Sequence, residues 1–109
     1  MAAFFVETIM REKFTAREPA VPTVLVDDAR SRVTRWDFAP GAETGWHKLA
    51  MNYVVVVLTD STFAVETDAG EQIVPMAAGT TYARPDGIEH NVRNGGDAPM
   101  AFVEIEFKR

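Results

Sequence analysis

The sequence contains no cysteine, which excludes a disulfide framework, a thiolate nucleophile and a cysteine-ligated zinc site. No apolar run approaches the roughly 18–20 residues of a membrane-spanning helix, and the longest, Tyr53 to Leu58, has the length of a strand. Cations are also scarce, with 11 Lys and Arg against 16 Asp and Glu and a net charge of −5. Binding to phosphate backbones or anionic membranes relies on clustered cations. We therefore expect neither nucleic acid nor a membrane as a partner.

Short apolar segments separated by turn residues follow one another from Thr23 onward. The last segment alternates, with Ala101, Val103, Ile105 and Phe107 on one face and Phe102, Glu104 and Glu106 on the other. This spacing, with no helical periodicity, predicts an antiparallel all-β sandwich or barrel. The expected strands are residues 24–26, 33–38, 53–58, 63–66, 72–76, 80–84, 88–93 and 101–107.

The first 20 residues differ from the rest of the chain. Their apolar residues, Phe4 to Val6 among them, have no basic region before them and are too few for a signal peptide, so we expect a cytoplasmic protein. Pro19 and Pro22 break whatever precedes them. The sequence thus predicts an N-terminal arm over residues 1–20 and one domain over residues 21–109. The arm either covers an open end of its own domain or adds a strand to a neighbour's sheet.

The segment from Gly79 to Asn94 carries a fixed pattern: Gly79, five residues, Pro85-x-Gly87, two residues, His90, three residues, Asn94. The glycines and the proline are suited to turns at the two ends of a strand, and His90 then falls on the next strand, on one face with Ile88 and Val92. The pattern resembles the second motif of the cupin family. That resemblance spans about Val33 to Phe107 and implies the RmlC-like fold, a double-stranded β-helix or jelly-roll barrel of antiparallel strands.

The first cupin motif is only half present. Gly41 and His47 fit it, but Leu49 stands in place of its second histidine, Tyr53 in place of its glutamate and Asp60 in place of its closing glycine. In the family, three histidines and one glutamate hold a divalent metal such as iron, manganese, nickel or zinc. Carried over, the resemblance leaves His47 and His90 as metal ligands, with Tyr53 as a third if it ionises.

Two imidazoles fall short of the three or four ligands that protein metal sites use. Glu43, Glu104 and Glu106 are carboxylates that can substitute, and the sequence does not decide whether they point inward. Three readings of His47 and His90 remain open: metal ligands, polar contacts of a metal-free pocket, or core histidines with satisfied hydrogen bonds. Tyr53 is equally interpretable as a packed barrel residue. The predicted pocket is lined by Trp46, Leu49, Tyr53, Ile88 and Val92.

The segments His47-Lys48-Leu49 and Tyr53-Val54-Val55-Val56 resemble most closely the one-domain cupins found alongside enzymes of β-alanine breakdown. The resemblance implies a protein that binds a small polar metabolite in the barrel. One hypothesis is a metal-assisted oxygenase, isomerase or lyase; the alternative is a metal-free binding or sensing module without catalysis. A third is an oligomeric structural subunit. We also expect a homodimer formed through an edge strand, because small barrels leave edges that need covering.

Overall fold

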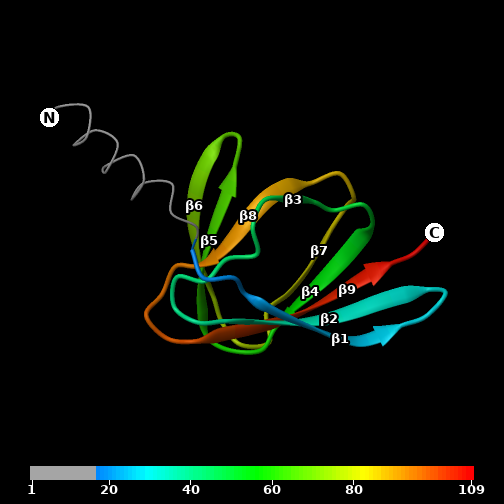
Figure 1. The fold of residues 1–109 in the computed structure, drawn as a ribbon, viewed down its shortest axis with the longest axis horizontal. Coiled ribbons are helices and arrows are strands. Elements are labelled where there is room, and N and C mark those ends of the chain that lie inside the picture. Colours follow the sequence, from blue (N-terminus) through cyan, green and yellow to red (C-terminus); the bar gives the residue numbers. More distant parts are fainter. Residues whose placement is uncertain (1–16) are drawn as a thin grey trace, which may run out of the picture.

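The structure, a computed structural model, describes residues 17–109, so both readings of the N-terminal arm concern residues that lie mostly outside the described part. The described part is all β, which confirms the predicted fold class (Figure 1). Its strands are β1 (Val21–Asp27), β2 (Ser31–Phe38), β3 (His47–Lys48), β4 (Asn52–Val57), β5 (Ser61–Thr67), β6 (Gly70–Met76), β7 (Thr81–Arg84), β8 (Glu89–Asn94) and β9 (Met100–Phe107).

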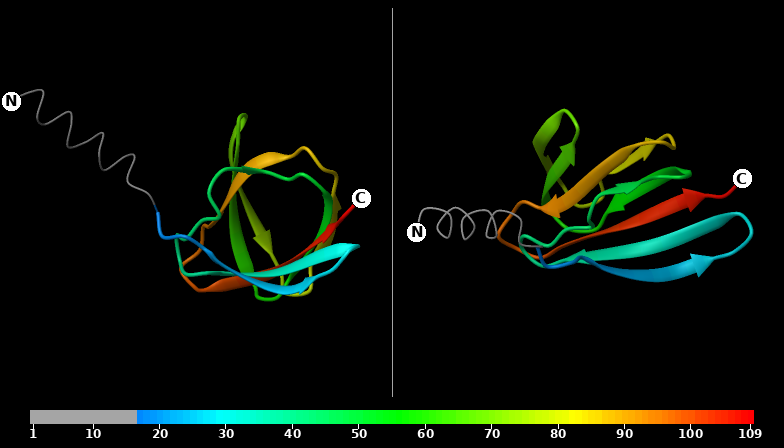
Figure 2. Two further views of the ribbon diagram at one scale, coloured as in Figure 1. Left: turned by 45° about the vertical axis from the view of Figure 1, so that its right-hand side comes forward. Right: turned by 45° about the horizontal axis from the view of Figure 1, so that its top comes forward.

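The strands form two antiparallel sheets that face each other across the core (Figure 2). One sheet has the order β1-β2-β9-β4-β7 and the other has the order β3-β8-β5-β6. The last strand, β9, lies between β2 and β4, so that Phe107 is opposite Ser31 on one side and Asn52 on the other. Consecutive strands are therefore often not neighbours, as in a jelly roll.

Register decides which side chains of the five-stranded sheet face the interior, because directly opposed residues share a face. Across β2, β9, β4 and β7, one interior row is Arg32, Glu106, Tyr53 and Arg84, and the next is Thr34, Glu104, Val55 and Tyr82. Further along, Trp36 is opposite Phe102, which is opposite Val57. The interior face thus changes from charged to apolar along the strands.

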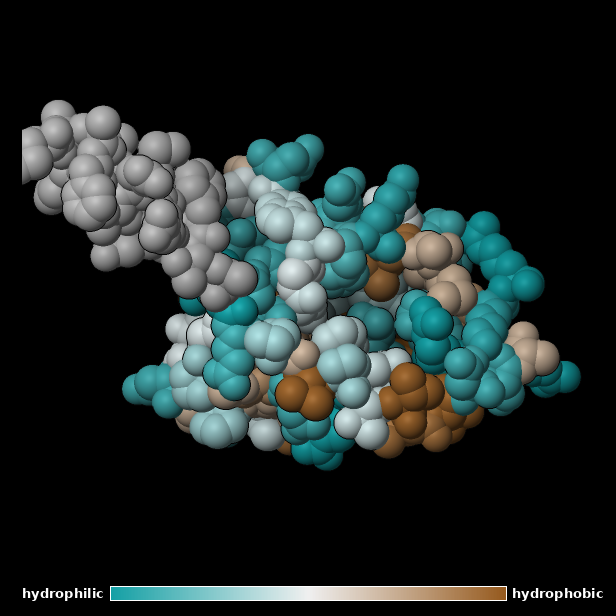
Figure 3. Space-filling view, viewed as in Figure 1, coloured by the Kyte–Doolittle hydropathy of each residue, from teal (hydrophilic) through white to brown (hydrophobic). Residues whose placement is uncertain are grey.

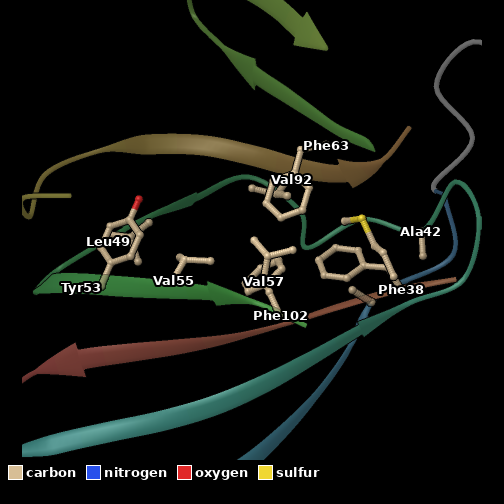
Figure 4. Packing of buried hydrophobic residues seen from close by; sticks show 11 residues of the cluster. Phe38, Ala42, Leu49, Tyr53, Val55, Val57, Phe63, Val92 and Phe102 are labelled. Atoms are coloured by element: carbon tan, nitrogen blue, oxygen red, sulfur yellow. The ribbon is translucent and has the colours of Figure 1, made fainter. Parts of the chain in front are cut away.

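The apolar end of the interior is the core (Figure 4). Phe38, Phe63 and Val57 are each 1% exposed, and the ring centroids of Phe63 and Phe38 lie 5.5 and 5.4 Å from that of Phe102. Burying a large side chain of this kind contributes about 1.5–3 kcal/mol to stability. This end of the barrel is therefore where most of the packing energy is gained.

The turns predicted from glycine and proline are confirmed. Strand β7 lies between Gly79 and Pro85, and the Gly79 and Gly87 backbones have φ values of +88° and +87°. At the end of the motif, Asn94 is buried, donates to the carbonyls of Phe38 and Ala98 and accepts from the Gly96 amide. The motif asparagine therefore ties the β2 end and the β8–β9 turn together at the closed end of the barrel.

Strand β1 stands apart from the rest of the sheet. It is an edge strand, and all seven of its residues are exposed, with Val21, Val24 and Leu25 each more than half exposed. Hydrophobic surface gathers at the lower right of the space-filling view, where Figure 1 places β1 and β2 (Figure 3). Pro19 and Ala20, just before β1, already contact the barrel: Ala20 is buried and its amide donates to the Glu43 carbonyl at 2.8 Å. Residues 17–109 contain no helix suited to spanning a bilayer.

Candidate functional site

The two histidines of the chain are brought together at one end of the barrel. The short strand β3 pairs with β8 so that His47 lies directly opposite His90, and their ring centroids are 4.8 Å apart in an edge-on arrangement. The β3–β8 pairing thus brings together two histidines that are about forty positions apart in the sequence. The two predicted histidines therefore lie side by side, and of the two it is His47 that lines the cavity described below.

A buried amide holds His47 in its orientation. Asn91, 2% exposed, accepts a hydrogen bond from the Gly45 amide at 2.9 Å and donates to Glu43 at 2.7 Å. Gly45 has a φ of +85°, which a side chain disfavours, and its carbonyl accepts from His47 Nδ1 at 2.8 Å. A carbonyl only accepts, so Nδ1 carries the proton, and in the neutral ring Nε2 is left with its lone pair.

The opposite wall of the mouth is supplied by the five-stranded sheet. Glu106, buried at 6% exposure, receives two hydrogen bonds from Arg32, at 3.1 and 3.3 Å, and this ion pair balances its charge. Glu104, two residues earlier on the same face, makes no hydrogen bond or ion pair within residues 17–109. Of the three carboxylates whose direction was open in sequence, Glu104 and Glu106 line the mouth, whereas Glu43 accepts from Asn91 and does not line it; of the two in the mouth, Glu106 is the one paired with a cation.

Burial and neighbouring charges shift the proton affinities in opposite directions across the mouth. Burial, then the Glu106 carboxylate, raises the pKa of Glu104 to about 7, against a smaller lowering by Arg32. Burial, then His47, lowers the pKa of His90 to about 4. The His90 imidazole is consequently neutral at pH 7, whereas the protonated and ionised forms of the Glu104 carboxyl are both populated at that pH.

A cavity of about 290 Å³ opens between these walls. This volume lies near the lower limit for small-molecule sites, so it suits a metabolite of a few heavy atoms. Besides the charged and imidazole groups, the wall includes Trp36, whose indole Nε1 is buried and has no hydrogen-bond partner among the described residues. The full lining is Arg32, Trp36, Thr44, His47, Lys48, Leu49, Ala50, Met51, Glu104 and Glu106.

The predicted lining residues divide between this cavity and other places. Leu49 lines the cavity and is also part of the core, at 4% exposure. Tyr53 and Val92 are buried core residues, while Ile88 is half-buried and its carbonyl accepts from the Leu49 amide. Trp46 is 55% exposed and lies instead in a separate surface hollow with Asp68, Gly87 and Glu89.

The family's metal can be tested against the donor set. Within residues 17–109, no group of three His, Cys, Asp or Glu side chains lies close enough together to hold a metal ion. Tyr53 is a poor third ligand, since burial and then the Glu104 charge raise the pKa of its phenol. Because two imidazoles are fewer than the three protein ligands of even an open metal site, a tightly held resident metal does not fit this donor set.

Sequence reasoning named Glu104 as a possible ligand without deciding its direction, and it did not place Trp36 in the pocket. In β9, Glu104 lies on the opposite face from Val103 and Ile105. If the apolar face is assumed to point inward, the Glu104 carboxylate is expected to point to solvent. The decisive signal is Phe102, which shares the Glu104 face and belongs to the core. Trp36 shares its face with Phe38 in the same way, as its alternation predicts.

Comparisons with known proteins were made on the whole chain. No family model matches it. The chain is 51% identical over 94 residues to the β-alanine degradation protein BauB of Pseudomonas aeruginosa, covering 86% of this chain and 99% of that one. A cupin domain from Bordetella pertussis has a TM-score of 0.83 at 46% identity, covering 87% of this chain and 99% of its own. An RmlC-like cupin from Shewanella frigidimarina has a TM-score of 0.65 at 18% identity, over 89% and 86% of the two chains, and shows the fold alone.

The jelly-roll strand order agrees with these cupin neighbours. The chain therefore belongs to the cupin family, as a small one-domain member related to a protein of β-alanine degradation.

Proposed function

We propose that this cupin binds a small polar metabolite in the cavity at its barrel mouth without a resident metal. The observation that carries the proposal is the set of polar groups left without partners in one cavity: the Glu104 carboxyl, the Nε2 lone pair of His47 and the buried Trp36 indole. Buried polar groups are normally paired. A bound polar molecule supplies the missing partners.

The relative named for β-alanine degradation supports the size and polarity of the ligand. A metabolite of that class is small enough for a cavity of about 290 Å³ and carries charged ends. On this proposal the histidines are polar contacts of the ligand, and the family's metal chemistry is replaced by hydrogen bonding.

A second function, proton-transfer catalysis of the isomerase or lyase type, is favoured by one observation. Glu104 has a pKa of about 7, and a group whose pKa is near the working pH is best suited to take up and return a proton. In that case Glu104 is the acid–base residue and His47, on the same cavity wall, is a polar contact of the ligand.

The binding proposal is tested by NMR on the ¹⁵N-labelled chain. The probes are β-alanine, propionate, malonate and 3-hydroxypropionate at up to about 10 mM, enough to detect millimolar affinity. We expect at least one probe to shift the indole signal of Trp36 and leave that of Trp46 unchanged. Trp46 is the internal control because it lies outside the cavity. If no probe shifts Trp36, the proposal fails.

The metal is tested separately. Elemental analysis of protein purified without a His tag, followed by titration with manganese, iron, nickel and zinc, is expected to find no site tighter than about millimolar. A metal bound at one per chain, and lost in both His47→Ala and His90→Ala, would overturn the metal-free proposal and restore the metal-assisted enzyme. Turnover of a probe abolished by Glu104→Gln, with binding retained, would establish the second function.

A further inference from the structure

Several polar groups that line the mouth cavity already have partners in the protein. The strongest donor, the Arg32 guanidinium, is already bound to Glu106 through two hydrogen bonds. The Thr44 hydroxyl donates to the Gly45 carbonyl at 3.0 Å, and its oxygen accepts from the Val92 amide. Lys48, also on the wall, is exposed to solvent, so the half-buried charged group that remains without a partner within residues 17–109 is the Glu104 carboxyl.

Two acceptors are uncommitted in the described part of the chain. His47 uses Nδ1–H on the Gly45 carbonyl, so its Nε2 presents a lone pair. Glu104 has no partner, although its neighbour Glu106 on the same strand face is fully paired. Both side chains line the same cavity. One buried donor, Trp36 Nε1–H, also lacks a partner and suits a single oxygen acceptor.

Resting on the proposed function, we infer that the cavity recognises its ligand by a primary ammonium group, held between the Glu104 carboxylate and the His47 imidazole. An ammonium carries three N–H donors and no acceptor, so it can donate to the Glu104 carboxylate and to His47 Nε2 at the same time. Its charge also compensates the Glu104 carboxylate, which no protein cation in residues 17–109 contacts. Charge-assisted hydrogen bonds of this kind are about twice as strong as neutral ones.

The neighbouring charges leave this role to Glu104 alone. Arg32 and Glu106 compensate one another on β2 and β9, and neutral His90 lies beside His47 on β8. Burial raises the pKa of Tyr53 on β4 and raises the pKa of Tyr82 on β7 to about 12, so neither phenol is charged at pH 7. Arg84, in the interior row with Tyr53, lies over the Tyr82 ring and makes no ion pair with Glu104, so ionised Glu104 has no cation in contact with it within residues 17–109.

The experiment compares three probes that differ by one group each: β-alanine, propionate, which lacks the amine, and ethylamine, which lacks the carboxyl. Dissociation constants are measured from the Trp36 and His47 NMR signals. We expect β-alanine and ethylamine to bind, and propionate to bind about tenfold more weakly or not at all, the loss set by one charge-assisted contact. Propionate binding as tightly as β-alanine would overturn the inference and leave the proposed function standing. No response to any of the three would overturn the inference, and the proposed function falls with it if malonate and 3-hydroxypropionate are silent too.

Variants sharpen the assignment. Glu104→Gln keeps the side-chain shape and loses the charge, and it is expected to weaken ethylamine binding about tenfold. Glu71→Gln is the matched control, because it makes the same change in net charge on β6, where Glu71 is exposed and paired with Arg93. Equal losses in the two variants would mean a nonspecific charge effect and contradict the inference. Thermal unfolding verifies that both variants are folded.

A pH profile distinguishes contact from a structural role. Alkylamines stay protonated below pH 9, as lysine does, and a carboxyl of pKa about 7 goes from one-tenth to nine-tenths ionised between pH 6 and 8. Ethylamine affinity in the natural chain should thus rise about tenfold over that range, and in Glu104→Gln it should stay flat. A rise that persists in Glu104→Gln would assign the effect to another group and overturn the role of Glu104.

Discussion

The closed end and the mouth of the barrel are built from the same strands and do opposite things. On β9, Phe102 packs in the aromatic core while Glu104 and Glu106 face the mouth, and on β8 the sequence from Asn94 back to His90 makes the same change. The closed end is apolar and tightly packed, and its buried asparagine is fully hydrogen-bonded. The mouth keeps unpaired titratable groups. The comparison teaches that stability and recognition are separated along each strand rather than between strands.

The largest change in stability is expected from a substitution in the apolar core at the closed end. Phe63→Ala removes a ring that is 1% exposed and that packs on Phe102. We expect a loss of about 3–5 kcal/mol in the free energy of unfolding, measured by urea denaturation. Ile73→Ala on the adjacent strand is the control, because Ile73 is 57% exposed and should lose less than about 1 kcal/mol. Similar losses in both variants would contradict the assignment of the core to the closed end.

The paired carboxylate of the mouth comes next. Glu106→Gln leaves the Arg32 guanidinium with an amide in place of a carboxylate. Hydrogen bonds to charged groups contribute about 1.5–3 kcal/mol, and because the Arg32 side chain is 40% exposed, we expect a loss of about 1.5 kcal/mol. Denaturation at 0.1 and 1 M salt measures it. A Glu106→Gln chain as stable as the natural one would mean that the ion pair contributes nothing.

Removing the charge of the unpaired carboxylate, Glu104, should raise the free energy of unfolding rather than lower it. The pKa of Glu104 is raised from 4.5 to about 7, so ionising this carboxyl destabilises the folded state. The natural chain therefore loses stability as the pH rises through that range. Glu104→Gln should therefore match the natural chain near pH 4.5 and exceed it by about 1–2 kcal/mol at pH 8, less than the roughly 3 kcal/mol of the full pKa shift because Glu104 is only half-buried and partly screened by solvent. Urea denaturation at both pH values checks this. A variant less stable at pH 8 would show that ionised Glu104 has a stabilising partner.

His90 provides the counterpart on the other wall. The pKa of His90 is lowered from 6.5 to about 4, so between these pH values the unfolded chain binds a proton at His90 that the folded chain does not. The free energy of unfolding therefore decreases as the pH falls from 6.5 to 4. Between pH 4.5 and 6.5 the two side chains act in opposite directions and nearly cancel. In Glu104→Gln the His90 contribution stands alone, and the stability of that variant should rise with pH over this range.

The smallest effect is expected at a turn between the two regions. Gly87 has a φ of +87°, and a Cβ there would meet no atom within 4 Å. Gly87→Ala therefore costs only the backbone strain of a left-handed residue, about 1 kcal/mol, seen as a small drop in melting temperature. Ala83→Gly, at an exposed position on β7, is a matched control for glycine–alanine entropy. A loss above about 3 kcal/mol in Gly87→Ala would indicate that this turn also shapes the mouth.

Much of the fold was predictable because its signals are local. Glycine and proline marked the ends of β7, and period-two alternation placed Trp36 and Phe38 on one face. The expectation that His47 and His90 lie in the same barrel mouth came from the family resemblance, since no local signal joins residues so far apart. The partner of a carboxylate is not a local property either. Glu104 and Glu106 have the same alternation and neighbours of the same type, yet only Glu106 is opposite Arg32 across the β2–β9 ladder, and that register is decided by the whole sheet.

The central place of β9 has a consequence for how the chain folds during synthesis. Residues 100–107 join β2 to β4, so the five-stranded sheet is not continuous until these last strand residues are available. Strand β2, made about 70 residues earlier, waits on the ribosome with its inner edge unpaired. Among residues 17–109 its early partner is β1, which precedes it in the same hairpin. The barrel is therefore a fold that closes late, and its mouth and core form together once β9 inserts.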